Sequence, residues 1–160
     1  MRRSRRLGIH RRTHRPPAGQ GRRRLITAVD TNVLIDVFGA DPEFGEASRE
    51  AMRQCRADGG LVACEVVWAE VTAGFPAAPE ADEALGRLQV AFSASDAPTA
   101  RAAGEGWRVH RQLGGGRVRV VADFLIGAHA SAHANRLLTR DRGFYRRYFQ
   151  RLQVLDPTRR

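Results

Sequence analysis

The sequence predicts an α/β fold, a single domain with a central parallel β-sheet flanked by α-helices. Short apolar runs typical of buried strands alternate along the chain with longer segments of helical character, which is the element order of a parallel sheet. The chain has 160 residues, enough for one domain with a sizeable core. In sheets of this kind, functional groups gather beyond the carboxyl ends of the strands.

The first half of the chain begins with the apolar run Leu25–Val29, a buried strand that ends at Asp30. Gly59 and Gly60 stop the second helix, and prolines separate the third helix from the fourth, because neither residue type continues a helix. The elements predicted here are a strand at 25–29, a helix through 33–38, a helix at 43–57, a strand at 61–64, helices at 65–74 and 81–90, and a strand at 91–93.

The second half begins with a long helix that three consecutive glycines end, at Gly114–Gly116. A nearly apolar helix follows, and its first residue is Asp123. The elements predicted here are helices at 98–113 and 123–134, a strand at 136–139, a short helix at 144–149 and a last strand at 152–155.

Residues 1–23 form a basic, proline- and glycine-broken segment that we expect to be disordered, ahead of a domain at 24–160. The segment fits a start codon assigned too early, an RNA-binding arm or an uninformative tail. Ten of the 27 arginines lie in residues 1–24, which leaves 17, equal to the 17 acidic residues. Net charge therefore gives no evidence that the domain binds RNA.

Composition also predicts the cellular compartment of the protein. The only cysteines, Cys55 and Cys64, are expected to be small core residues in a reduced compartment, because two thiols make neither a disulfide framework nor a structural zinc site. No apolar run is long enough to span a membrane, and no apolar segment follows the arginine pairs near the start. We therefore expect a cytoplasmic protein.

Four acids, each at the edge of or inside an apolar segment, are the candidate catalytic and metal-binding residues. They are Asp30, Glu70, Asp123 and Asp141. Carboxylates in apolar surroundings need a partner or a metal, and several brought together repel unless a divalent cation relieves the repulsion. Hard oxygen ligands suit Mg²⁺ or Mn²⁺, which activate water against phosphodiesters.

The segments around these acids read AVDTNVLID, VACEVVWAEV, ADFLIGAHA and LLTRDRGFYRRYF. In this order and at these separations they resemble the PIN domain, and within it the VapC-type toxin ribonucleases of bacterial toxin–antitoxin pairs. The resemblance covers about Leu25 to Pro157 and implies a PIN-like fold.

The resemblance also implies a function. It is that of an Mg²⁺- or Mn²⁺-dependent endoribonuclease toxin, which hydrolyses single-stranded or loop RNA of a tRNA or rRNA and leaves a 3′-hydroxyl and a 5′-phosphate. Its expected partners are a cognate VapB-type antitoxin and a second copy in a homodimer. Beside the four acids, Asn32 is expected to orient Asp30 or a water, and Thr139 to hold Asp141 or a water. Arg140, Arg142 and Arg146 are expected to bind RNA.

Each of these residues also has a plainer interpretation. Asp30 suits a helix N-cap. Glu65, about 140° around the helix from Glu70, suits the positive end of the helix dipole. The arginines near Asp141 and the aromatic residues between them fit an RNA-binding edge, or equally a solvated face over core aromatics. His129 and His133, four apart, are expected to lie on the helix surface.

Two other functions remain as alternatives. One is a haloacid-dehalogenase-type phosphatase, whose motif requires a second aspartate at the position where this chain has Asn32. The other is a catalytically inert PIN-like module that binds RNA or a partner. The family suggests a groove for an antitoxin helix, to which five apolar residues could contribute, although most are expected to be core: Phe38, Trp68, Phe75, Leu85 and Leu88.

Overall fold

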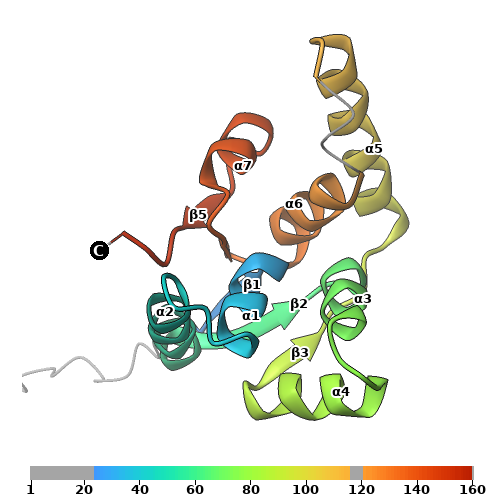
Figure 1. Cartoon of the computed structure of the whole chain (residues 1–160). Coiled ribbons are helices and arrows are strands. Elements are labelled where there is room, and N and C mark those ends of the chain that lie inside the picture. The colour runs from blue at the N-terminus through green and yellow to red at the C-terminus, as the bar shows by residue number, and fades with distance from the viewer. Residues whose placement is uncertain (1–23, 116–120, 160) are drawn as a thin grey trace, which may run out of the picture.

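The computed structural model describes residues 24–115 and 121–159, so the expectation of disorder at 1–23 concerns residues outside the described ones. A five-stranded sheet has the order β3-β2-β1-β4-β5, and all pairs are parallel. The predicted α/β fold with a parallel sheet is confirmed (Figure 1). Its strands are β1 (Leu25–Val29), β2 (Gly59–Ala63), β3 (Val90–Phe92), β4 (Arg136–Leu138) and β5 (Gln153–Leu155).

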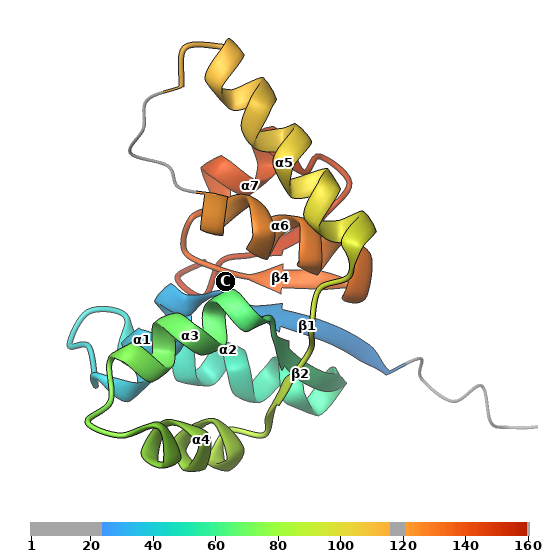
Figure 2. The ribbon, with the colours of Figure 1, turned by 90° about the vertical axis from the view of Figure 1, so that its right-hand side faces the viewer.

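Helices connect every strand to the next, as parallel pairing requires. The helices are α1 (Thr31–Phe38), α2 (Gly45–Asp58), α3 (Glu65–Ala73), α4 (Ala78–Arg87), α5 (Ala97–Gln112), α6 (Val121–His133) and α7 (Arg142–Tyr148). Helix α2 packs on β1 and β2, and α6 packs on β1 and β4, on the opposite side of the sheet in Figure 1. Helix α5 lies along α6, as Figure 2 also shows.

The direction of the chain through the sheet reverses between β1 and β4. The chain steps outward from β1 to β2 and β3, then crosses to β4 and continues outward to β5. Ligands of open α/β sheets bind at the carboxyl ends of the strands at such a point, where the two sets of connections part. The residues that follow β1 and β4 are therefore the first candidates for a site.

The core confirms most of the apolar pattern. Leu34, Phe124 and Leu137 are fully buried, and the free thiols of Cys55 and Cys64 are buried as expected. A Cβ atom on Gly59 would lie 2.0 Å from the carbonyl oxygen of Leu25, so the close approach of β1 and β2 there requires glycine.

Several predicted boundaries are wrong: the fourth helix begins at Ala78 rather than at 81, and β2 begins at Gly59 rather than at 61. The helix expected to reach Val90 ends at Arg87, because Gln89 has a positive φ of 56° that a helix cannot continue. Val90 then begins β3 and pairs with Leu61. Across the described ranges, no helix combines the length and the apolar character that crossing a membrane requires.

Candidate active site

Asp30 lies at the point where the chain leaves β1, and it is 5% exposed. The Thr139 hydroxyl donates a 2.6 Å hydrogen bond to Asp30 Oδ2, and the Asn32 amide donates a 2.9 Å bond to the same oxygen. Asp30 occupies the N-cap position of α1, but its side chain makes no capping hydrogen bond. The backbone of Asp30 thus fills the cap position that the helix-cap interpretation expected, while its side chain binds Thr139 and Asn32 instead of the helix.

The loop after β4 brings a second acid to the same edge of the sheet. Thr139 is fully buried, and its hydroxyl oxygen accepts a 2.9 Å bond from the backbone N–H of Asp141. Asn32 Oδ1 accepts a 3.1 Å bond from the backbone N–H of Arg140. Asp141 itself caps α7 by accepting from the N–H of Phe144 at 3.3 Å. Thr139 and Asn32 thus tie the end of β1 to the loop that carries Asp141.

Asp123 lies in the first turn of α6, half-buried. Burial, together with the nearby charge of Asp123, raises the pKa of Asp30 to about 6 in spite of the hydrogen bond from Thr139. Burial, followed by the charges of Asp30, Asp123 and Asp141, also raises the pKa of the Tyr145 hydroxyl. Asp30 and Asp123 therefore act on each other, and both of them, together with Asp141, act on Tyr145.

Glu70 reaches this edge through a neighbour of Asp30. It is an exposed residue of α3, and its carboxylate accepts a short hydrogen bond from the Thr31 hydroxyl. Glu65, the other acid of α3, instead accepts from the N–H and hydroxyl of Ser95, at 3.0 and 3.2 Å. The two glutamates of α3 therefore have different partners, and only Glu70 is connected to the Asp30 segment.

The donor set fits a hydrated, hard cation. Within residues 24–115 and 121–159, no three His, Cys, Asp or Glu side chains are close enough together to bind one ion. Mg²⁺ does not need such a cage, because it keeps several waters and binds through one or two carboxylates. The buried hydroxyl of Tyr145 lies beside these carboxylates and adds a further polar group to the site.

The arginines around Asp141 differ in their surroundings. The Nε of Arg140 lies 2.9 Å from the buried carboxylate of Asp36, and its guanidinium stacks on Phe44 at 4.3 Å from the ring centroid. Arg142 lies 3.7 Å from Asp156, and Arg146 is exposed on α7.

The aromatic residues of α7 are more buried than a base-stacking edge would require. Phe144 is 7% and Tyr145 1% exposed, and the rings of Phe144 and Phe124 meet edge to face with centroids 5.0 Å apart. Neither ring can stack on a base, so that part of the interpretation is wrong for these two residues.

The surface position expected for His129 is also wrong. Its ring is 1% exposed and shares a 2.9 Å hydrogen bond with the Ser93 hydroxyl, because α6 packs against the segment that follows β3. His133 is partly exposed and lies 3.1 Å from the Thr99 hydroxyl.

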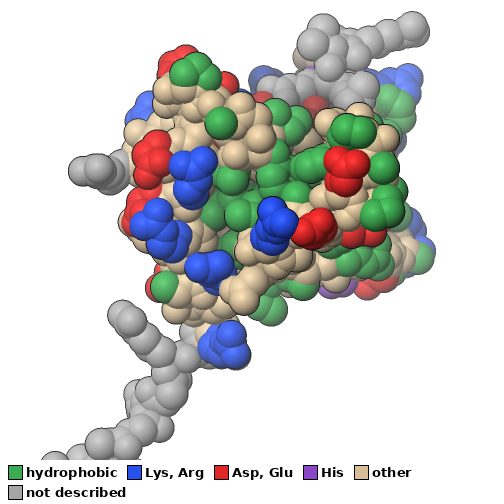
Figure 3. Space-filling model, turned by 60° about the horizontal axis from the view of Figure 1, so that its bottom comes forward, with side chains coloured by type: hydrophobic (Ala, Val, Ile, Leu, Met, Phe, Trp, Pro, Cys, Tyr) green, Lys and Arg blue, Asp and Glu red, His purple; other side chains and the backbone are tan. Residues whose placement is uncertain are grey.

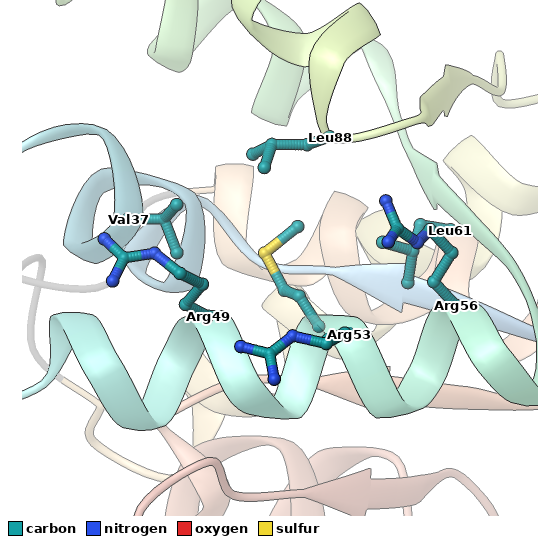
Figure 4. A pocket seen from close by; sticks show the side chains of 7 residues that line it. Val37, Arg49, Arg53, Arg56, Leu61 and Leu88 are labelled. Carbon is teal, nitrogen blue, oxygen red and sulfur yellow. The ribbon is translucent and has the colours of Figure 1, made fainter.

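A separate apolar groove lies away from these acids, between α1, α2 and the end of α4. Figure 3 shows hydrophobic side chains gathered at the centre of one face, with charged side chains at their border. In Figure 4 Leu88 lies across from the α2 side chains, and the groove is lined by Val37, Arg49, Met52, Arg53, Arg56, Leu61 and Leu88. Of the residues proposed for a groove, Leu85 is fully buried and belongs to the core, whereas Leu88 lines this groove.

The sequence matches the family model of the PIN domain over residues 27–150, a range that includes all four acids. The chain belongs to the PIN domain family. This assignment confirms the resemblance noted from the sequence, and it argues against a dehalogenase-type phosphatase, as does Asn32, whose amide donates to Asp30.

Solved structures with the same fold share little sequence with this PIN domain. The VapBC2 structure from Rickettsia felis, bound to a promoter DNA fragment, has a chain with a TM-score of 0.66 at 18% identity, with 82% of this chain and 98% of that chain covered. A chain of VapBC-1 from nontypeable Haemophilus influenzae has a TM-score of 0.64 at 21% identity, with 84% of this chain and 100% of that chain covered. A chain of FitAcB from Neisseria gonorrhoeae has a TM-score of 0.58 at 20% identity, with 82% of this chain and 97% of that chain covered. No curated protein matches the chain.

Two residues of the site, Thr31 and Asp36, escaped the sequence analysis, and a third, Tyr145, was given another role there. Thr31 binds Glu70, Tyr145 faces the acids, and Asp36 holds Arg140. Thr31 directly follows Asp30, and a hydroxyl next to a candidate ligand is a signal that could have been used. Nothing local distinguishes Tyr145 or Asp36 from ordinary helix residues.

Proposed function

We propose that this PIN domain is a metal-dependent endoribonuclease toxin that hydrolyses phosphodiester bonds in single-stranded or loop RNA, with a tRNA or rRNA as substrate. The observation that supports it best is the buried carboxylate of Asp30, held by Thr139 and Asn32 at the chain-reversal point of the sheet. The charges of Asp123 and Asp141 lie nearby. A buried carboxylate close to other carboxylates lowers the stability of the fold, and a bound cation would offset that repulsion.

The residues have separate roles in this proposal. Asp30, Glu70, Asp123 and Asp141 would hold a hydrated Mg²⁺ or Mn²⁺, in part through its waters, and the bound ion would lower the pKa of a water and neutralise charge on the phosphate. Thr139 and Asn32 orient Asp30, and Arg142 and Arg146 attract the RNA backbone from the start and the exposed side of α7. Arg140 contributes through Asp36, because it holds the loop between Thr139 and Asp141 in place.

Cleavage of purified tRNA and rRNA in Mg²⁺ or Mn²⁺ tests the proposal. Asp30→Asn and Asp123→Asn should abolish cleavage, because each removes an anionic ligand with little change in shape. Glu70→Gln should lower it strongly, whereas the matched variant Glu65→Gln should cleave like the wild type, because Glu65 binds Ser95 instead. Undiminished cleavage in EDTA would rule out the metal mechanism. RNA binding without any cleavage would favour the inert binding module.

We also propose that a cognate VapB-type antitoxin neutralises the protein. The solved structures above are described as VapBC and FitAcB assemblies, and the groove offers a docking surface. Its apolar floor and the three α2 arginines at its rim suit an amphipathic helix with acidic residues along its edge. Arg53→Glu and Leu88→Asp should weaken co-purification with the antitoxin, whereas Arg101→Glu on the exposed side of α5 should not.

The quaternary state and location belong to the same proposal. We expect a homodimer in the cytoplasm. Light scattering of the purified protein measures the first, and a fluorescent fusion measures the second.

A further inference from the structure

A small hollow between α5 and α7 lies outside the set of four acids. It has a volume of about 220 Å³ and is lined by His110, Gly143, Phe144, Arg147 and Tyr148. Flat rings and one exposed arginine therefore make up most of its wall. Aromatic rings and guanidinium groups are the surfaces on which proteins stack the bases of single-stranded RNA.

The hollow adjoins both of the segments that carry Asp123 and Asp141. The backbone N–H of Phe144 donates to Asp141 at 3.3 Å. Phe124 directly follows Asp123 in the chain. Its ring centroid lies 5.0 Å from that of Phe144 and 5.2 Å from that of Tyr148. One RNA strand can therefore reach the acids and the hollow together.

The ring of Tyr148 is held in place but is not enclosed. Its hydroxyl shares a 2.7 Å hydrogen bond with His110 Nδ1, and the two rings meet edge to face with centroids 5.5 Å apart. The ring is half-buried, whereas Phe144 beside it is 7% exposed. A ring that is fixed before binding loses little conformational entropy when a ligand stacks on it.

The arginines near the hollow differ in whether their charge is already paired. Arg140 and Arg142 each have an aspartate partner. Arg146 and Arg147 are exposed and, across the residues that the structure describes, form no ion pair. The guanidinium carbon of Arg147 lies 5.5 Å from the centroid of the Tyr148 ring. An exposed cation–π contact is weak, so this guanidinium can leave the ring and bind a phosphate.

Gly143 keeps one side of the hollow open. It is exposed, and a Cβ atom on it would have no other atom within 4 Å. It lies within α7 and has no positive φ, so neither packing nor backbone conformation requires glycine there. A long side chain at this position can therefore fill the edge of the hollow without displacing the protein around it.

We propose that the hollow binds one nucleobase of the RNA substrate, which stacks on the Tyr148 ring while Arg147 binds the phosphate of the same nucleotide. The inference rests on the proposed function, because it takes RNA as the substrate. Stacking accepts any base but requires that the base be unpaired, so this site selects single-stranded or loop RNA over a duplex.

Fluorescence polarisation of a labelled RNA hexanucleotide with the full-length Asp30→Asn protein in EDTA tests the site without cleavage. Tyr148→Leu in this parent should weaken binding about 5- to 150-fold, the usual effect of losing one base–aromatic stack. Tyr148→Phe keeps the ring and should bind close to the parent. Gly143→Leu should weaken binding while its melting temperature stays equal or rises, because glycine is a poor helix former.

Arg147→Ala has a matched control in Arg151→Ala. Arg151 is also exposed, but it precedes β5 and so lies at the opposite edge of the sheet from Asp141. Arg147→Ala should weaken RNA binding and make it less dependent on salt, because one phosphate contact is lost. Arg151→Ala should change neither quantity.

Hexanucleotides that each lack a single base identify what the hollow binds. One of these abasic RNAs should bind the parent more weakly than the intact RNA does. Tyr148→Leu should bind that abasic RNA and the intact RNA equally, because the stack is absent from both complexes. Gly143→Leu should give the same result with the Tyr148 ring still present.

The outcomes separate this inference from the proposed function. If Tyr148→Leu and Gly143→Leu bind RNA like the parent, the hollow is not a base site, whatever the wild type cleaves. If Tyr148→Leu remains as sensitive to the missing base as the parent, the ring only supports α7 and the proposal is wrong. A wild type that cleaves no RNA, beside a parent that shows the expected loss with one abasic RNA, refutes the nuclease but keeps the base site.

Discussion

Replacement of Asp36 by alanine should destabilise the protein, because this residue holds two elements and the site loop together. Asp36 is 2% exposed, and its carboxylate accepts a 2.7 Å hydrogen bond from the Ser48 hydroxyl of α2. The same carboxylate forms the 2.9 Å ion pair with Arg140, which stands between Thr139 and Asp141. The variant therefore leaves a buried hydroxyl unpaired and an arginine without its counter-charge.

The two losses differ in size. An unpaired buried hydroxyl costs about 1–3 kcal/mol. Arg140 has a side chain 33% exposed, so water compensates most of its lost ion pair, and that part is about 1 kcal/mol or less. The sum, about 1–4 kcal/mol, corresponds to a melting temperature lower by up to roughly 10 °C for a chain of this size.

Urea unfolding followed by circular dichroism measures this change. Ser48→Ala isolates the hydroxyl, and the double variant Asp36→Ala/Ser48→Ala should cost less than the sum of the two single variants, because they share one hydrogen bond. Glu83→Ala is the control, since its ion pair with Arg87 is exposed. If Asp36→Ala costs no more than Glu83→Ala, the network does not hold the loop and the reasoning is wrong.

Three further outcomes follow from the site and its surroundings. Asp30→Asn should raise the melting temperature in EDTA, because it removes a buried charge next to Asp123; a fluorimetric melt that shows a decrease contradicts this. Burial lowers the pKa of His129, so the folded state binds fewer protons than the unfolded one, and stability should fall as pH drops below about 6.5. Because His133 and Glu65 also face this histidine, the test compares the wild type with His129→Gln. The free energy of unfolding in urea should depend less steeply on pH in the variant. Equal slopes in the two proteins exclude the effect. Deletion of residues 1–23 should leave unfolding and cleavage unchanged, and a weaker salt dependence of RNA binding after deletion would instead identify an RNA-binding arm.

Local sequence was sufficient for much of the fold. The strand that ends at Asp30 follows from a run of apolar residues closed by an acid, and parallel pairing follows from the alternation of elements. The burial of His129 could also have been read from the sequence, because α6 is apolar on nearly all sides and such helices lie in the interior. The surface prediction was wrong because it considered the spacing of the two histidines without the apolar character of the helix around them.

Other features depend on contacts that no local pattern contains. Asp36 and Arg140 are neighbours only because β4 pairs with β1, and each residue alone looks like a solvated charge. Tyr145 and Tyr148 are three residues apart on one short helix, yet one faces the acids and the other faces His110. The sequence could not separate them, because the difference depends on which elements pack on each side of α7.

The same long-range contacts make the site depend on the pairing of β1 with β4. The bond from Thr139 to Asp30 joins residues 109 apart, and it can form only when β1 and β4 are paired. Asp30 is then buried next to Asp123, which opposes folding, while Thr139 and Asn32 compensate part of that cost. A variant that loosens β4 should therefore lose the orientation of Asp30 before the rest of the sheet unfolds. Metal affinity is consequently expected to be a more sensitive measure of damage at this edge than global stability.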